Sequence, residues 1–280
     1  MKTEIVADFP CRCGEGPLWH PDRNLLYWID VDNGKMYAYD PKERSATRIL
    51  QGDIIGGTTL QENGDLLLFM QRGQIALWNP EKGLQIQRDH TPGAENTRFN
   101  DVIAAPDGGV FAGTMPEGEQ PGKLYRLETN GSIRVLLDDI GQPNGMGFSP
   151  DRKTFYLTDT RNRRIESFRY ENGELQERQT LITVKGDGQP DGMTVDENGH
   201  LWVALWDGEA ILRYDSTGQL QQTIPMPVKN VTSLTFVQNR AYVTTAGGGH
   251  RPEAGAHAGA LFLLETDVSA PLEFRSRVQF

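Results

Sequence analysis

Oxygen-bearing side chains recur at one position of a repeated pattern, and together they could hold a metal ion. A turn with Asp or Asn at its centre, followed by an alternating apolar run, occurs six times in the chain. The six turn residues are Asp22, Asn63, Asp107, Asp151, Asn198 and Asn239. Seven residues before them stand Glu15, Gly56, Asn100, Asn144, Asp191 and Thr232. The two carboxylates and two amides of this set suit Ca²⁺, Mg²⁺ or Mn²⁺ better than a thiolate-binding metal.

Turn chemistry is the competing interpretation of each of these residues taken alone, because Asn, Asp and Gly are common in turns. Their shared register favours a site. Equivalent positions of a circular repeat lie on one ring, so the six residues are expected to face one another across one mouth of a channel.

The spacing of the turns indicates which elements position these residues. The six copies recur at intervals of 41 to 47 residues, a period that suits one four-stranded propeller blade. Each copy continues through further turns and strands with period-2 alternation, and no long window has helical periodicity. The sequence predicts an all-β fold, a six-bladed β-propeller forming one domain over residues 1–280. An unspecific β-sandwich is the weaker alternative.

A propeller ring needs closure, and the N-terminal segment offers a strand for it. The strand predicted over Glu4–Phe9 precedes the first copy of the repeat. We expect it to pair into the last blade, so that no sheet edge stays open.

Composition limits the class of partner. The 280 residues carry a net charge of −10, which argues against a nucleic-acid partner. No stretch approaches eighteen apolar residues, and the N-terminus lacks a signal-peptide pattern, so we expect no membrane partner and a cytoplasmic location. The only cysteines, Cys11 and Cys13, are expected to be reduced. The sequence predicts no particular oligomeric state.

Motifs for other chemistries are missing or weak. The chain contains no GxSxG elbow, no HExxH and no P-loop, so serine-hydrolase, zincin and nucleotide-binding functions have no support. The segment Asp30–Gly34 looks like part of a calcium loop, but a hairpin turn is the better interpretation because the EF-hand spacing is not met.

Several strings resemble the regucalcin/gluconolactonase (SMP-30-like) family of sugar lactonases in order, spacing and coverage of the whole chain. They are CRCGEGPLW (Cys11–Trp19), TRFNDV (Thr97–Val102), FAGTM (Phe111–Met115), PNGMGFSPD (Pro143–Asp151), PDGM (Pro190–Met193) and LWVA (Leu201–Ala204). The resemblance implies a six-bladed propeller that opens sugar lactones with one divalent metal ion. Ca²⁺ is the first candidate, and Mg²⁺, Mn²⁺, Zn²⁺ or Fe²⁺ are the others.

The resemblance also implies roles for the metal ligands. It assigns the metal to Glu15, Asn144 and Asp191, with Asp191 also the catalytic base. Three protein ligands would leave open positions for water and for the lactone carbonyl, whose developing negative charge the cation would stabilise.

For substrate, the resemblance assigns contacts to Arg98 and Asn100. The family often places an acidic residue just after FAGTM, and in this chain Glu117 and Glu119 compete for that role. Asp101 has two interpretations: a site residue, or a residue at the start of a strand that orients its neighbours.

Three alternatives to a lactonase have less support in the sequence. A non-catalytic calcium-binding or regulatory protein would not need the substrate contacts of Arg98 and Asn100. A hydrolase of phosphotriesters or aryl esters would need an apolar mouth, whereas the loops Met115–Lys123 and Gly247–Gly259 are polar and glycine-rich. A protein-binding platform would not need an acidic cluster. The expected partner is therefore a small-molecule sugar lactone.

Overall fold

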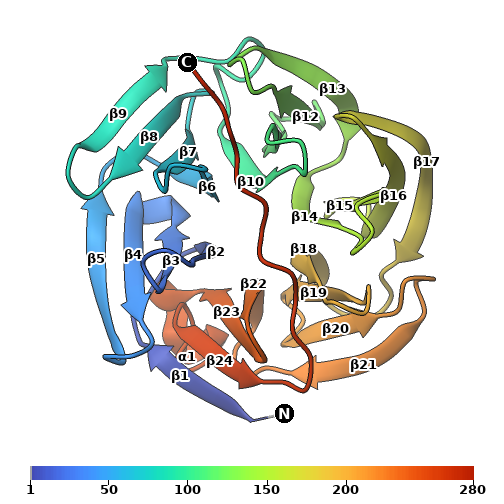
Figure 1. Ribbon diagram of the computed structural model, residues 1–280. Coiled ribbons are helices and arrows are strands. Elements are labelled where there is room, and N and C mark those ends of the chain that lie inside the picture. The colour runs from blue at the N-terminus through green and yellow to red at the C-terminus, as the bar shows by residue number, and fades with distance from the viewer. Residues whose placement is uncertain (1) are drawn as a thin grey trace.

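Short alternating strands separated by Gly, Asn and Asp turns pair with their chain neighbours, and this builds six antiparallel sheets of four strands each. The computed structural model describes residues 2–280. The sheets are arranged as blades around a central channel, with the innermost strand of each blade nearest the axis (Figure 1). The predicted six-bladed β-propeller is therefore confirmed.

The first three blades follow the chain from its inner to its outer strand. The first comprises β2 (Gly14–His20), β3 (Leu25–Asp30), β4 (Lys35–Asp40) and β5 (Ser45–Gln51), with the 3-10 turn η1 (Val31–Asn33). The second comprises β6 (Ile55–Leu60), β7 (Leu66–Met70), β8 (Ile75–Asn79) and β9 (Gly83–Arg88). The third comprises β10 (Phe99–Ala104), β11 (Val110–Thr114), β12 (Gly122–Leu127) and β13 (Ile133–Ile140).

The remaining blades have the same order, with one difference in the last. The fourth comprises β14 (Pro143–Phe148), β15 (Thr154–Asp159), β16 (Arg164–Glu171) and β17 (Glu174–Thr183), and the fifth β18 (Gln189–Val195), β19 (Leu201–Trp206), β20 (Ala210–Tyr214) and β21 (Leu220–Pro225). The sixth comprises β22 (Asn230–Val237), β23 (Arg240–Ala246), β24 (Leu261–Glu265) and β1 (Thr3–Ala7). The turn η2 (Gly248–His250) and the helix α1 (Arg251–Ala254) lie between β23 and β24.

The two ends of the ring meet in the sixth blade, where β1 pairs antiparallel with β24 from Thr3 opposite Leu264 to Ala7 opposite Leu261. The outermost strand of this blade thus comes from the N-terminus, and its three inner strands come from the C-terminal part of the chain. This arrangement ties the two ends of the chain together through backbone hydrogen bonds.

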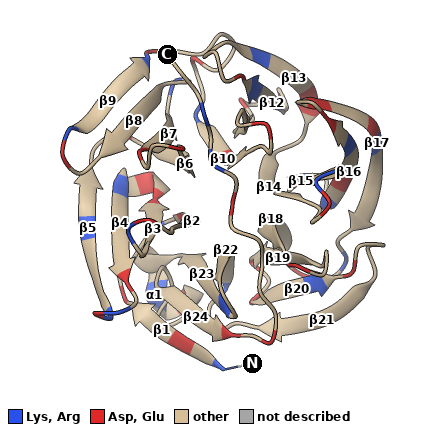
Figure 2. Cartoon of the chain, viewed as in Figure 1, with Lys and Arg blue, Asp and Glu red and all other residues tan. Residues whose placement is uncertain are grey.

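The hydrophobic core is divided into six clusters, and each lies between two adjacent blades. Between the third and fourth blades, for example, Phe111 packs against Phe155 with ring centroids 4.7 Å apart. Figure 2 shows that charged residues lie mainly in the turns and outer strands. Most of the net charge is therefore away from the channel.

The last residues of the chain cross one mouth of the channel (Figure 1). After β24, Thr266 bonds to Asn239 in the turn between β22 and β23, and Ser276 pairs with Gln61 of the second blade. Farther along, Gln279 bonds to the carbonyl of Thr129 in the third blade. This C-terminal segment, residues 266–280, connects blades on opposite sides of the ring. Across residues 2–280 no helix is long and apolar enough to cross a membrane.

Candidate active site

The six equivalent residues occupy equivalent places in the structure. Each is the second or third residue of the innermost strand of its blade. They are Glu15 in β2, Gly56 in β6, Asn100 in β10, Asn144 in β14, Asp191 in β18 and Thr232 in β22. These strands surround the channel (Figure 1), so the shared register predicted from the turns places the residues around one end of it.

A local irregularity accompanies these residues in all six blades. The pairing between the innermost strand and its neighbour shifts register there, for example between Glu15 and Leu18 and between Pro190 and Met193. The other four blades have the same shift at the same place. A bulge releases one residue from the ladder and changes the direction of its side chain, which is why bulges are common beside active sites.

Close approach of neighbouring strands explains the glycines that follow two of the candidate ligands. A Cβ on Gly145 would collide with the backbone nitrogen of Met193, and a Cβ on Gly192 would collide with the hydroxyl of Ser233. Only glycine leaves room for strands this close together. The Asn-Gly and Asp-Gly pairs in the sequence therefore serve contacts between blades at these two places, rather than hairpin turns.

Asn144 and Asp191 are in direct contact. Both are buried, with 2% and 6% of their surface exposed, and the Asn144 amide Nδ2 donates a hydrogen bond to Asp191 Oδ1. The same Nδ2 donates to the hydroxyl of Thr160 at 3.0 Å. Within the described residues, Asn144 Oδ1 is buried and accepts no hydrogen bond. Leaving a buried acceptor unpaired costs about 1–3 kcal/mol, so this oxygen calls for a partner that the chain does not supply.

The electrostatics of the carboxylates of Glu15 and Asp191 also favour a bound cation. Glu15 is 7% exposed, and its Oε2 accepts the N–H of Gly16 at 2.9 Å. Burial, followed by the negative charges of Asp191 and Asp101, raises the pKa of Glu15 well above its ordinary value. Burial and the charge of Asp101 likewise raise the pKa of Asp191. A divalent cation would reverse this penalty by favouring the ionised forms.

The donor set fits a hard metal ion. No three His, Cys, Asp or Glu side chains in the described part of the chain form a metal cluster by themselves, and the candidate set instead combines two carboxylates with an amide oxygen. Oxygen ligands of this kind are typical of Ca²⁺ and Mg²⁺ sites. Burial, with Glu15 as the next cause, raises the pKa of the nearby Cys13 thiol well above its ordinary value, which disfavours a thiolate ligand. Glu15, Asn144 and Asp191 would hold the ion.

Arg98 and Asn100 form a pair in the third blade. Arg98 Nη1 donates to Asn100 Oδ1 at 2.7 Å and to the Phe99 carbonyl at 2.9 Å. Asn100 Nδ2 donates to the Pro143 carbonyl, next to Asn144, at 3.0 Å. Arg98 Nε and Nη2 make no hydrogen bond within residues 2–280, so these donors are available to a ligand. Asn100, by contrast, uses both ends of its amide within the protein.

The two glutamates expected near the substrate make no hydrogen bond or ion pair with this cluster in the described part of the chain. Glu117 and Glu119 are exposed on a tight turn, in which the backbones of Glu117 and Gln120 bond to each other. Neither side chain has a hydrogen-bond or ion-pair partner among the residues described.

Asp101 is a third acid beside the candidate ligands. It is partly buried, and burial raises its pKa to about 7, while Arg98 partly offsets this effect. Its place next to Asn100 was the only signal for it in the sequence. No sequence pattern pointed to Thr160, because its bonds to Asn144 and to the Pro190 carbonyl depend on how the fourth and fifth blades pack together.

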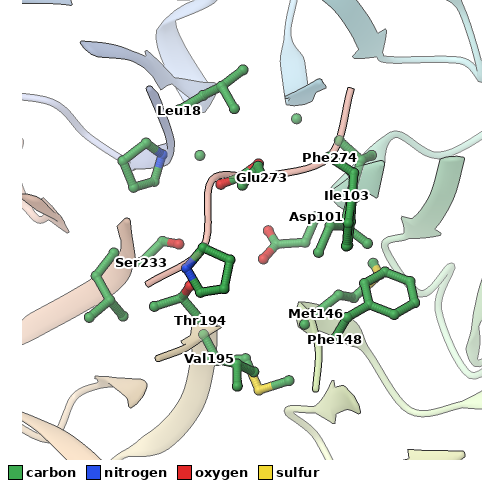
Figure 3. A pocket seen from close by; sticks show the side chains of 18 of the residues that line it. Leu18, Asp101, Ile103, Met146, Phe148, Thr194, Val195, Ser233, Glu273 and Phe274 are labelled. Carbon is green, nitrogen blue, oxygen red and sulfur yellow. The ribbon is translucent and has the colours of Figure 1, made fainter. Parts of the chain in front are cut away.

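A cavity of about 500 Å³ lies in the channel next to the candidate ligands. Its lining begins one or two residues after them, at Gly16, Met146 and Met193. It combines apolar side chains with polar ones such as Thr194 and Ser233 (Figure 3). The side chains of Asp101 and Glu273 both line the cavity, and Figure 3 shows them near each other at its centre. Glu273 belongs to the C-terminal segment, which crosses the far end of the channel. Arg98 directly precedes β10, the innermost strand of the third blade, and therefore lies toward the end of the channel opposite the C-terminal segment.

Comparison with known proteins identifies the family. Residues 13–247 match the family model described as the SMP-30/gluconolactonase/LRE-like region, and the chain belongs to that family. It is 40% identical over 296 residues to pentonolactonase XacC of Haloferax volcanii, with 100% of this chain and 99% of the relative covered. It is 31% identical over 267 residues to human regucalcin, with 90% and 89% covered. The structure of the calcium-binding protein regucalcin from Agrobacterium tumefaciens has the same fold, with a TM-score of 0.89, 24% identity and coverage of 99% and 98%.

Proposed function

We propose that this protein is a metal-dependent lactonase that hydrolyses a sugar lactone to the aldonic acid. Membership of the family and the likeness to pentonolactonase XacC support the class of reaction. The observation that carries the proposal is the buried, unpaired Oδ1 of Asn144 beside the buried carboxylate of Asp191. A divalent ion would satisfy both groups.

The proposed chemistry divides between the metal and the side chains. When bound, the cation acts as a Lewis acid toward the lactone carbonyl. Asp191 Oδ1 accepts the amide of Asn144, so Oδ2 is the oxygen free to take a proton from the attacking water. The water oxygen forms the new bond to the carbonyl carbon and the bond to the ring oxygen breaks. The proton then passes to that oxygen, which becomes the hydroxyl of the open-chain acid.

Substrate recognition falls to Arg98. Its Nε and Nη2 have no partner among the described residues, and a guanidinium presents its donors in a planar fork that suits adjacent sugar oxygens. The polar loops Met115–Lys123 and Gly247–Gly259 leave strands β11 and β23 at the end of the blades where the candidate ligands lie. Because the C-terminal segment crosses the other mouth, we place substrate entry at this end. Glu117 and Glu119 stay candidates for contacts from the first of these loops.

The test is a panel of pentono- and hexonolactones crossed with Ca²⁺, Mg²⁺, Mn²⁺ and Zn²⁺, run on chelated protein with acid release as the readout. We expect no enzymatic opening without metal and opening of at least one sugar lactone with a divalent ion. Asp191→Ala should remove that activity while the protein stays folded. Opening at the full rate after chelation would disprove the metal dependence, and wild-type activity in Asp191→Ala would disprove the role of Asp191.

A non-catalytic calcium-binding role is the second candidate. The likeness to human regucalcin and to a solved calcium-binding relative favours it. The free donors of Arg98 beside the carboxylates favour the enzyme, because an ion-binding protein has no need of them. Calcium binding by a protein that opens none of the lactones would decide for the second candidate.

A further inference from the structure

The carbonyl group that precedes each proposed metal ligand accepts a hydrogen bond from a side chain of the preceding blade. Thr232 of the sixth blade donates to the Gly14 carbonyl, next to Glu15, at 2.6 Å. Asn100 of the third blade donates to the Pro143 carbonyl at 3.0 Å. Thr160 of the fourth blade donates to the Pro190 carbonyl, next to Asp191, at 2.7 Å. All three proposed ligands are thus held from a neighbouring blade.

The other three equivalent positions lack this bond. The carbonyls that precede Gly56, Asn100 and Thr232 belong to Ile55, Phe99 and Val231. Within residues 2–280 none of these carbonyls accepts a hydrogen bond from a side chain of another blade. The cross-blade bonds therefore coincide with the ligand positions, although all six innermost strands have the same bulge. General stabilisation of the ring would not select these three.

Thr160 does more than hold a carbonyl. Its single hydroxyl proton is used by the Pro190 carbonyl, so its oxygen can only accept from Asn144 Nδ2, 3.0 Å away. With Nδ2 held by Thr160 and Asp191, the Asn144 amide is fixed with Oδ1 left free for a ligand. One buried hydroxyl therefore acts on two candidate ligands from different blades.

We propose that Thr160 and Thr232 are positioning residues, which orient the metal ligands through bonds between blades. The proposal rests on the proposed metal centre. Thr160 aligns Asn144 and Asp191, and Thr232 aligns Glu15. Both threonines are buried, with 4% and 0% of their surface exposed, so neither is itself open to substrate. Outer groups that orient metal ligands typically contribute a factor of about 10–100 in metal affinity.

The experiment measures binding of Mn²⁺ and Ca²⁺ to the chelated full chain, by electron paramagnetic resonance and calorimetry, well below the melting temperature. Thr160→Val removes the hydroxyl and keeps the shape, and we expect it to weaken binding by roughly 10- to 100-fold. Thr160→Ser restores the hydroxyl, and its affinity should return to within about threefold of wild type. The matched control is Thr158→Val, because the Thr158 hydroxyl is buried in the same blade and has no hydrogen-bond partner among residues 2–280. Its metal affinity should not change.

The outcomes separate the two levels of the proposal. Unchanged affinity in Thr160→Val, with metal bound by wild type, would overturn the positioning role alone. A wild-type protein that binds no divalent ion would overturn the metal centre and this inference with it. If Thr160→Val does not fold, Thr232→Val carries the same test for Glu15. Equal loss of affinity in Thr158→Val and Thr160→Val would also overturn the role, because it would reduce the effect to packing.

Discussion

The second and fifth blades have the same four-stranded architecture, yet at the equivalent position one has Gly56 and the other Asp191. A Cβ on Gly56 would collide with the backbone carbonyl of Phe99 in the next blade, so the second blade has no room for a ligand there. Both blades have a glycine one residue later, Gly57 and Gly192, where a Cβ would again lie too close to the next blade. Only in the fifth blade is the preceding position free for a carboxylate, and this second close contact at Gly56 is what excludes a ligand from the second blade.

The second blade instead contributes through its backbone. Gln71, just after β7, bridges to Arg98, and Arg72 bonds to the carbonyl of Thr97. These bonds hold the start of the third blade's innermost strand, where Arg98 and Asn100 lie. One region thus supplies charge to the proposed metal, and the other supports the residue proposed to grip substrate.

The largest expected effect comes from making the fifth blade resemble the second in charge. Asp191→Asn keeps the size of the side chain and removes its negative charge and its capacity to accept a proton. We expect lactone opening at saturating metal to fall by about a thousandfold or more. Initial rates, with circular dichroism to confirm the fold, provide the measurement. A rate within tenfold of wild type would show that the base lies elsewhere.

A substitution in the second blade tests why that blade lacks a ligand. Gly56→Ala places a Cβ against the Phe99 carbonyl, and we expect it to lower the free energy of unfolding by about 3 kcal/mol in urea denaturation. The control is Gly52→Ala, because a Cβ there would have open space around it. That variant should be neutral or slightly more stable. Equal stabilities for the two variants would refute the steric explanation.

This contrast also indicates how far the sequence could be interpreted. The Asx turns recur with the blade period, and the turn chemistry is local, so the register that brings Glu15, Asn144 and Asp191 to equivalent strands could be predicted from residue types alone. The bulges could not, because a break in the ladder depends on the pairing of two strands. The bond from Thr160 to Pro190 spans 30 residues and two blades, and no local pattern reports it.

The two ends of the chain also differ in how well the sequence predicts them, because one has a local pattern and the other depends on long-range contacts. The N-terminal strand alternates and could be assigned to the last blade, where β1 pairs with β24. The C-terminal segment has no period, and its path across the channel depends on single contacts such as that of Arg275 with Asp22. The turn with Glu117 and Glu119 is exposed and makes no side-chain bonds within the described residues, so neither the sequence nor the fold distinguishes the two glutamates.

A smaller effect is expected on the side that the second blade supports. Arg98→Lys keeps the positive charge and replaces the planar fork with a single ammonium group. We expect KM for the lactone to rise by about tenfold, with a smaller change in kcat. The control is Arg12→Lys, because Arg12 is exposed and its ion pair with Asp32 is long, with 3.9 Å between Nε and Oδ2. A change confined to kcat would place Arg98 in the reaction rather than in binding.

The smallest expected effect concerns pH and the carboxylate of the first blade. Burial and neighbouring acids raise the pKa of Glu15 in the folded protein above its ordinary value of 4.5. Between these two values the folded protein holds a proton that the unfolded chain releases, so metal-free wild type loses stability as pH rises above 4.5. Gln at this position does not titrate. The melting temperature of metal-free Glu15→Gln should therefore gain on that of wild type as pH rises.

Saturating calcium should reverse this order, because an ion that binds the folded state stabilises the protein that keeps all three ligands. Thermal melts of both proteins from pH 5 to 8, with chelator and with calcium, test the sign in each condition. A gain for Glu15→Gln that is the same with and without calcium would mean that Glu15 carries a buried charge unrelated to metal. The first blade would then resemble the second, whose innermost strand supplies no ligand. A reversal would place Glu15 with Asp191, as a carboxylate whose cost in the folded state is offset only when the ion is bound.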